Sequence, residues 1–221
     1  MEKRVRYNCI KSLKQEGVPI IIVAAHFEAE AIANACRDNG IIVSAYCDSE
    51  KRKSYEPFCG LEVVHTPNMP SRFSKARFII ATQHVDEVVE QLSGLGYEEF
   101  YSAMELLENY DVGKYKHHIS QSYMETRISI YKKSYEAYFN EEKTYMRSLD
   151  VMITTKCSLK CKNCSNLMQY YVDAKNTDCE NILTSIKTLS QNVDDISEFR
   201  LIGGEPLMNK DWANIVNSIS E

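Results

Sequence analysis

Short apolar runs alternate with segments of helical spacing over residues 19–103, and this pattern carries most of the information about the fold. The longest runs are rich in isoleucine and valine without polar alternation, which is typical of strands buried on both faces of a parallel sheet. The predicted strands are residues 20–25, 41–46, 61–65, 77–81 and 99–102, the last of them at the sheet edge. Helices are predicted over residues 28–38 and 85–95, and a shorter one over residues 3–15.

The first predicted strand, helix and second strand fit within about thirty residues, the length of a right-handed βαβ unit with parallel strands. The same alternation continues as far as residue 103. The sequence therefore predicts the α/β fold class, with a small doubly wound parallel sheet as the first domain, residues 1–103. This topology resembles the small Rossmann-like domains that precede sugar-modifying enzymes such as sialic-acid and bacillosamine acyltransferases.

The first strand-to-helix turn decides whether this domain carries a dinucleotide fingerprint. Residues 24–30 contain no glycine, and Glu28 and Glu30 would repel a pyrophosphate, so NAD binding is not favoured. Asp48 occupies the place of a ribose-binding acid, although a lone aspartate at a strand end is usually a turn residue. A nucleotide-sugar ligand and a docking role both stay open. His26 is interpreted as a local hydrogen-bonding residue.

Residues 104–148 differ in composition and are predicted to be a helical connector. Nine of the 14 tyrosines fall between Tyr97 and Tyr145, and several of them lie three or four positions apart, as on one face of a helix. Such a stripe could stack on nucleic-acid bases. We favour a helix face that packs domains together, with the hydroxyl groups at its rim.

The charge balance agrees with that choice. The chain has 31 acidic and 26 basic residues, a net charge of -5, which gives no electrostatic footprint for nucleic acid or for an anionic membrane surface. The charged N-terminal segment does not resemble a secretory signal, and the apolar runs are far shorter than a membrane span. We therefore expect a cytoplasmic protein with reduced thiols and with neither nucleic acid nor membrane as a partner.

A second series of alternating strands and helices begins at residue 149. Strands are predicted over residues 149–155 and 198–202, and a helix over residues 211–219. Asp178 is the expected N-cap of another helix that runs to Ser190. Residues 149–221 are therefore predicted to contain two βα units.

The eight cysteines fall into two groups. Those predicted to be small buried side chains are Cys9, Cys36, Cys47 and Cys59. Three more, Cys157, Cys161 and Cys164, lie on one loop directly after a predicted strand, where their thiolates can converge on a metal centre. Three thiolates on a four-iron cluster leave one iron without a protein ligand, where a small molecule can bind. A structural zinc site requires four protein ligands, and Cys179 is a candidate for the fourth, although it is distant in the sequence.

The C-x3-C-x2-C spacing of Cys157, Cys161 and Cys164 resembles the signature of the radical S-adenosylmethionine (SAM) superfamily. A second feature agrees, because Gly203-Gly204-Glu205-Pro206 follows the next strand, as the GGEP element of that family does. The resemblance covers residues 149–221, about a third of the chain. Asn163 departs from the family pattern, in which the residue before the third cysteine is often aromatic and packs near adenine.

The resemblance implies a radical SAM enzyme with two cofactors, a [4Fe-4S] cluster on the three cysteines and SAM bound to the open iron. Gly203, Gly204, Glu205 and Pro206 would line the methionine end of SAM. An electron from a flavodoxin- or ferredoxin-like donor would cleave SAM to a 5'-deoxyadenosyl radical, which abstracts hydrogen from an unknown substrate. The chain supplies only the first two strand-helix units of the family's barrel, so either it is a fragment or another chain completes it. We favour a fragment that is inactive alone.

The alternative belongs to a different functional class. In it, the Rossmann-like domain is a non-catalytic module that binds a nucleotide or a partner protein, and the cysteine loop is a structural metal knuckle. The metal content of the protein distinguishes the two hypotheses. A radical SAM enzyme requires iron for its [4Fe-4S] cluster, and a structural metal knuckle requires zinc.

Overall fold

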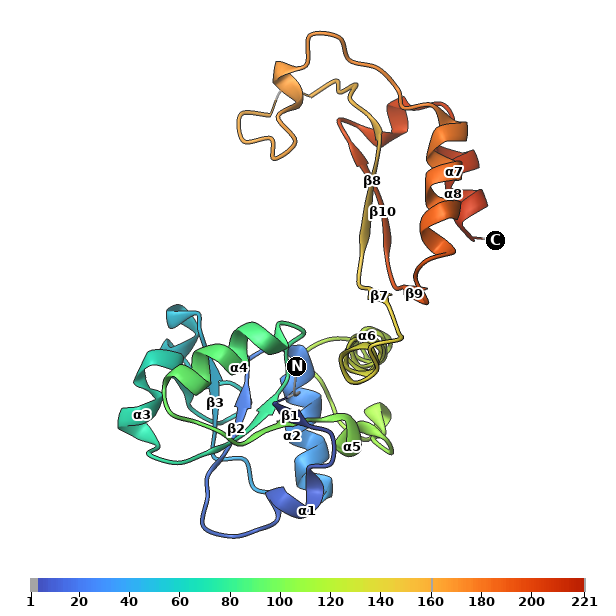
Figure 1. The fold of residues 1–221 in the computed structure, drawn as a ribbon. Helices are drawn as coiled ribbons and strands as arrows, with labels where there is room; N and C mark the ends of the chain where they lie inside the picture. The colour runs from blue at the N-terminus through green and yellow to red at the C-terminus, as the bar shows by residue number, and fades with distance from the viewer. Residues whose placement is uncertain (1–3, 160, 221) are drawn as a thin grey trace. The chain divides into compact units, whose positions relative to one another are not determined.

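The computed structural model describes residues 4–159 and 161–220, and the chain divides into two compact units, Met1–Phe139 and Asn140–Glu221 (Figure 1). The first unit contains a parallel six-stranded sheet with the order β1-β6-β5-β2-β3-β4. Its strands are β1 (Val5–Arg6), β2 (Ile20–Val23), β3 (Ala45–Asp48), β4 (Val63–His65), β5 (Arg77–Ile80) and β6 (Phe100–Ser102). The chain adds β3 and β4 on one side of β2 and then β5 and β6 on the other, so the strand order reverses between β2 and β5, as in doubly wound folds.

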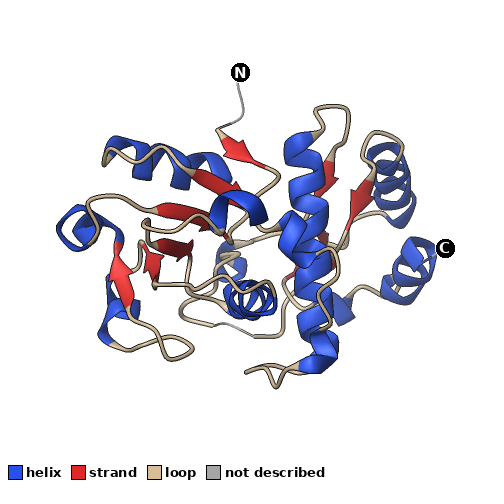
Figure 2. Cartoon of the chain, turned by 90° about the horizontal axis from the view of Figure 1, so that it is seen from below, coloured by secondary structure: helices blue, strands red, loops and turns tan. Residues whose placement is uncertain are grey.

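Helices flank the row of strands in the first unit (Figure 2). They are α1 (Ile10–Leu13), α2 (Phe27–Asp38), α3 (Met69–Arg72), α4 (Val85–Gly94), α5 (Met104–Leu107) and α6 (Gln121–Phe139), with 3-10 turns at Lys51–Tyr55, Thr66–Asn68 and Val112–Lys114. The core consists mainly of the apolar strand residues and the inner faces of α2, α4 and α6. The predicted α/β fold class is thereby confirmed.

Three local predictions in this unit are wrong. The helix over residues 3–15 is reduced to α1, because Val5 is buried and pairs with Phe100 in a parallel strand instead. As a result β6 lies between β1 and β5 and is not an edge strand. The strand expected from Ile41 begins only at Ala45, since the chain turns at Gly40 (φ 68°) and leaves Ile42 84% exposed before it reaches the sheet.

The tyrosine stripe of α6 belongs to the core of the first unit. Tyr131 and Tyr135 are fully buried, and their rings stack at a centroid distance of 4.3 Å. Both hydroxyl groups donate to the carbonyl oxygen of Ile80 at the end of β5, at 2.9 and 2.8 Å. The Tyr131 hydroxyl also accepts from the Ala103 amide at 2.8 Å. These tyrosines therefore pack α6 against the sheet through both their rings and their hydroxyls.

These contacts predict unequal costs for two similar substitutions. Tyr135→Phe is expected to lower the free energy of unfolding by about 1 kcal/mol, because it removes one net hydrogen bond. Tyr131→Phe is expected to cost about 2 kcal/mol, because it also leaves the buried Ala103 amide unpaired. Urea unfolding followed by near-ultraviolet circular dichroism measures both, with the exposed Tyr123→Phe as a control near zero. Equal costs for the two variants would contradict the assignment of the Ala103 bond.

The second unit has two longer parallel strands, β8 (Leu149–Thr154) and β10 (Phe199–Gly203), with Phe199 opposite Leu149. A shorter parallel pair is formed by β7 (Tyr145–Met146) and β9 (Asp195–Ile196). The helices are α7 (Cys179–Ser190) and α8 (Trp212–Ser220), with 3-10 turns at Met168–Tyr170 and Pro206–Met208.

A small core of Ile153, Ile182 and Ile215 joins β8 to α7 and α8. Asp178 caps α7 as predicted, and its side chain accepts from the Asn181 amide at 2.9 Å. The strand-helix-strand-helix order of this unit is the one that the sequence predicts, and its place in a larger barrel stays a prediction. Among the described residues no helix combines the length and apolar character that a membrane crossing requires.

Candidate functional site

The cysteine loop and the Gly203–Pro206 segment lie at the same edge of the second unit. Because β8 and β10 are parallel, their carboxyl ends meet there, and Cys157 follows β8 while Gly203 ends β10. Two backbone hydrogen bonds join the segments, from the Gly204 amide to Thr154 O at 3.0 Å and from the Glu205 amide to Lys156 O at 2.8 Å. The two sequence motifs are therefore in direct contact through their backbones.

The two glycines are required by this contact. A Cβ atom on Gly203 would lie 2.1 Å from Thr154 O, and one on Gly204 would lie 2.1 Å from Lys156 O and 2.8 Å from the Cys157 Cβ. Gly203 also has a φ of 149°, which side-chain-bearing residues rarely adopt. The resemblance to the radical SAM family attributes these glycines to contact with SAM. The structure shows a second reason for glycine at both positions, because any side chain would prevent the segment from packing against the start of the cysteine loop.

Two asparagines hold the same assembly together. The Asn166 side chain, two residues after the third cysteine, donates to Gly203 O at 2.9 Å. Asn209 is fully buried, and its side chain donates to Ile153 O in β8 at 2.8 Å. Sequence analysis missed both residues. The sequence feature that could have indicated them is an asparagine within three residues of each motif. Its side-chain amide can donate hydrogen bonds to backbone carbonyl oxygens that have no partner in a loop.

The cysteine side chains suit a thiolate ligand set. Cys157 and Cys164 are half-buried and Cys161 is exposed. Hydrogen bonds from the backbone amide of Met168, and then from those of Asn166 and Leu167, hold the pKa of Cys164 below its usual value. Amides that donate to sulfur favour the deprotonated form, which is the form that binds metal. The backbone of the loop therefore favours the thiolate form of Cys164, the form in which cysteine binds iron.

The sulfur atoms are not gathered as they would be around one zinc ion. Zinc–sulfur bonds of about 2.3 Å hold tetrahedral ligands about 3.8 Å apart. Among the described residues, the group of potential metal ligands that lie within 4.8 Å of one another is Glu30, Cys59 and His118, and it includes none of the loop cysteines. Cys179 instead packs beside the Ile153 core. A cluster binds each cysteine through a different iron and therefore spaces the sulfurs more widely.

Glu205 and Pro206 begin a 3-10 turn beside the loop. Pro206 occupies its first position, and the Glu205 carboxylate accepts from the Leu207 amide at 3.2 Å. Glu205 is half-buried, so its charge is held near the loop while part of the side chain stays accessible. A carboxylate in this position can accept a hydrogen bond from a cationic amino group.

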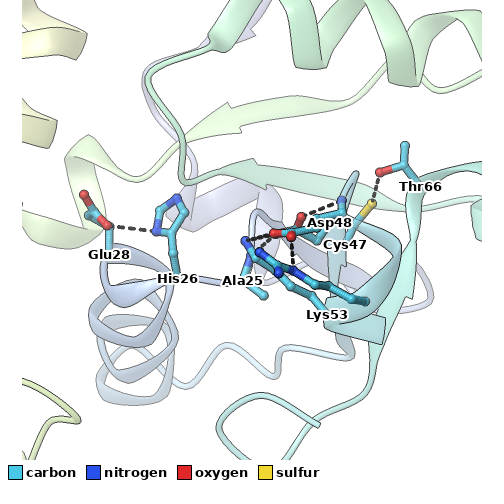
Figure 3. A network of polar contacts seen from close by, with 9 residues as sticks. Ala25, His26, Glu28, Cys47, Asp48, Lys53 and Thr66 are labelled. Atoms are coloured by element: carbon cyan, nitrogen blue, oxygen red, sulfur yellow. Dashed lines mark hydrogen bonds and ion pairs between the residues drawn. The ribbon is translucent and has the colours of Figure 1, made fainter. Parts of the chain in front are cut away.

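A second candidate site lies at the carboxyl edge of the sheet in the first unit (Figure 3). A cavity of about 280 Å³ there is lined by residues that include Ala24, Asp48, Thr66 and Thr82. The Asp48 carboxylate, however, accepts from the Ala25 amide and from the Lys53 ammonium, both at 2.9 Å. Asp48 is thus used to fix the turn after β2, which matches its interpretation as a turn residue.

The N-terminus of α2 is occupied by the chain's own carboxylate. Glu28 is 4% exposed, lies 2.8 Å from the His26 Nδ1 and pairs with Arg127 at 2.5 Å. His26 is therefore a local partner of Glu28, as expected. Burial alone raises the pKa of Glu28, but the hydrogen bond and charge of His26 and the charge of Arg127 lower it overall. The negative charge stands where a Rossmann domain places pyrophosphate.

The lowered pKa of Glu28 predicts a pH dependence of stability. A carboxyl group with a folded pKa below its unfolded value of about 4.3 stabilises the fold above that pH and loses the effect as the pH falls through the folded pKa. Glu28→Gln is therefore expected to have a lower free energy of unfolding than the natural chain at neutral pH, and this difference is expected to shrink as the pH falls below about 4.3 and through the folded pKa of Glu28. Urea unfolding of both chains at several pH values in this range measures the difference in the free energy of unfolding. A difference that does not change with pH would contradict the ion-pair role of Glu28.

The scattered cysteines are mostly packing residues. Cys9, Cys36 and Cys47 are completely buried, and burial raises the pKa of Cys9 to about 12 and that of Cys47 to about 11. The prediction is wrong for Cys59, which is an exposed residue in a two-residue turn with Gly60. Both turn residues have positive φ, because Phe58 and Leu61 pair directly across the turn. Sequence composition alone gives no sign of this turn's conformation.

A family model described as a 4Fe-4S single cluster domain matches residues 146–221. This match covers the second unit, with all three loop cysteines and the Gly203–Pro206 segment. No curated protein and no solved structure matches the chain. The predicted iron-sulfur character is therefore confirmed at the level of a 4Fe-4S cluster domain.

Proposed function

We propose that the 4Fe-4S cluster domain in residues 146–221 belongs to a radical SAM enzyme. In this proposal Cys157, Cys161 and Cys164 bind a [4Fe-4S] cluster, and SAM binds to the iron that has no protein ligand. The observation that carries the proposal is the contact between the two motifs. The Gly204 and Glu205 amides bond directly to the backbone of residues 154–156, next to the first cysteine.

Each residue has a defined task in this function. The three cysteines donate thiolates, and the backbone amides around Cys164 favour its charged form. Gly203 and Gly204 keep the backbone close to the loop, and the Glu205 carboxylate is placed to accept from the amino group of SAM. The exposed Cys161 leaves the loop open to a flavodoxin- or ferredoxin-like electron donor. When bound, the cluster supplies the electron that cleaves SAM to a 5'-deoxyadenosyl radical, which abstracts hydrogen from the substrate.

Titration with SAM tests this function, because turnover is not expected from this chain alone. The chain is reconstituted anaerobically with iron and sulfide and titrated with SAM. We expect about one SAM per cluster, and no binding to the variant in which Cys157, Cys161 and Cys164 are all alanine. Protein that holds about four irons per chain and binds no SAM would contradict the proposed function.

Metal analysis tests the alternative of a binding module with a metal knuckle. That alternative requires one zinc ion and no iron on the three cysteines and a fourth ligand. The proposed function requires about four irons per chain with inorganic sulfide. Zinc that is bound by the loop and resists displacement by iron and sulfide would overturn the cluster and support the knuckle.

A further inference from the structure

Three potential metal ligands of different chemistry meet in the first unit, away from the cysteine loop in the sequence. They are Glu30 in α2, Cys59 in the turn between Phe58 and Leu61, and His118 in the segment before α6. One ligand atom from each lies within 4.8 Å of the other two. None of these contacts has a part in the proposed radical chemistry.

Glu30 is the centre of this group. Its side chain is buried, and its Oε1 lies 3.1 Å from the Nδ1 of His118 and 3.7 Å from the Nδ1 of His117. The second carboxylate oxygen accepts from the His118 backbone amide at 3.3 Å. Among the described residues these two histidines are the ion-pair partners of Glu30, and no lysine or arginine pairs with its buried carboxylate.

His117 supplies an independent sign of a missing cation. Its side chain is 1% exposed, and its Nε2 lies 3.2 Å from Val112 O. The same nitrogen lies 3.4 Å from the Tyr110 hydroxyl, which can accept as well as donate. Because a carbonyl oxygen only accepts, the shorter contact to Val112 O favours a ring proton on Nε2. In the neutral ring Nδ1 then presents a lone pair, and this atom is buried without a hydrogen-bond partner while it faces the Glu30 oxygen. With this tautomer, the Nδ1 of His117 and the Glu30 oxygen are placed to bind the same cation.

The same histidine has the surroundings of a metal ligand. A histidine that binds metal through one nitrogen commonly donates its other ring N–H to a backbone carbonyl, which fixes the ring and its tautomer. The contact from Nε2 of His117 to Val112 O has this form. His118 is exposed, and its ring stacks on Phe58, the residue before Cys59, which positions the ring near the turn.

We propose that Glu30, Cys59 and His118 bind a Zn²⁺ ion in the first unit and that the Nδ1 of His117 is the fourth ligand. The donor set decides the metal. Calcium and magnesium prefer oxygen ligands alone, whereas zinc accepts sulfur, nitrogen and carboxylate oxygen in one tetrahedron. Ligand bonds of about 2.0–2.3 Å place the donor atoms under 4 Å apart, so small side-chain movements complete the site. The ion would fasten the turn at Cys59 to α2.

Cobalt binding tests this site without interference from the cysteine loop. The probe is Co²⁺, added to the full chain in which Cys157, Cys161 and Cys164 are alanine. One Co²⁺ per chain is expected, with a thiolate-to-cobalt charge-transfer band, intense tetrahedral d–d bands and full displacement by Zn²⁺. A chain that binds no Co²⁺, or that binds it without the thiolate band, would overturn the proposal.

Single substitutions in the same background assign the ligands. Cys59→Ala should abolish the charge-transfer band. Because Cys59 is exposed, the circular dichroism spectrum of this variant is expected to match that of the parent chain, which shows that the fold is intact. His118→Ala and His117→Ala should each weaken Co²⁺ binding at least about tenfold. His84→Ala is the matched control for His118, since both are exposed and each lies near a glutamate. A charge-transfer band that persists in Cys59→Ala, or equal losses in His84→Ala and His118→Ala, would contradict the site.

Discussion

Replacement of Cys157, Cys161 or Cys164 by alanine is expected to abolish [4Fe-4S] binding in the reconstituted chain. Each cysteine would hold a different iron, so the loss of one thiolate opens a second iron to solvent and lets the cluster decay. Iron content is expected to fall from about four per chain to near background. Anaerobic reconstitution followed by iron and sulfide analysis and visible absorption measures the loss.

The matched control for these variants is Cys179→Ala. Cys179 is half-buried at the start of α7 and packs beside the Ile153 core, so its removal tests whether any cysteine of the second unit matters. We expect this variant to retain its iron. Full iron content in any one of the three loop variants, or loss of iron in Cys179→Ala, would contradict the ligand assignment.

Gly204→Ala is expected to break the contact that joins the two motifs. The new methyl group would lie 2.1 Å from Lys156 O and 2.8 Å from the Cys157 Cβ, so the backbone must move on one side or the other. A forced backbone shift of this kind lowers the free energy of unfolding by about 1–3 kcal/mol. Trp212, the one tryptophan of the chain, lies in α8, so its fluorescence reports the denaturant unfolding of the second unit. We also expect weaker cluster binding, because Cys157 is displaced.

Gly94→Ala is the control for the general effect of a methyl group. Gly94 ends α4, and a Cβ atom there meets nothing within 4 Å. Alanine in a helix is favoured over glycine by up to about 1 kcal/mol, so this variant should be as stable as the natural chain or more so. A Gly204→Ala chain with unchanged Trp212 unfolding and unchanged iron content would contradict the packing role of the glycine pair.

The chain's regular elements could be predicted because their signals are local. The apolar run at β2, the spacing of α2 and the cap at Asp178 each depend on neighbouring residues, and the structure places all three as expected. The contact between the two motifs does not belong to these local features, because it needs the pairing of β8 with β10, which brings their carboxyl ends to one edge of the second unit.

The remaining features depend on contacts between distant segments, which local patterns do not encode. Val5 forms a strand only because Phe100 lies beside it, and the nearby charged residues hide this pairing. The sequence predicts Cys59 to be a packing residue, because nothing near it in the sequence points to Glu30 or His118. The glycine pair was explained by a ligand because the approach of Lys156 becomes visible only in three dimensions.

The most direct test of the central claim is the electron paramagnetic resonance spectrum of the reduced, reconstituted chain with and without SAM. The open iron of a three-cysteine cluster is the proposed binding position of SAM. We predict that SAM shifts the g values of the cluster signal in the natural chain and in Cys179→Ala. A cluster signal that is identical with and without saturating SAM would contradict the account.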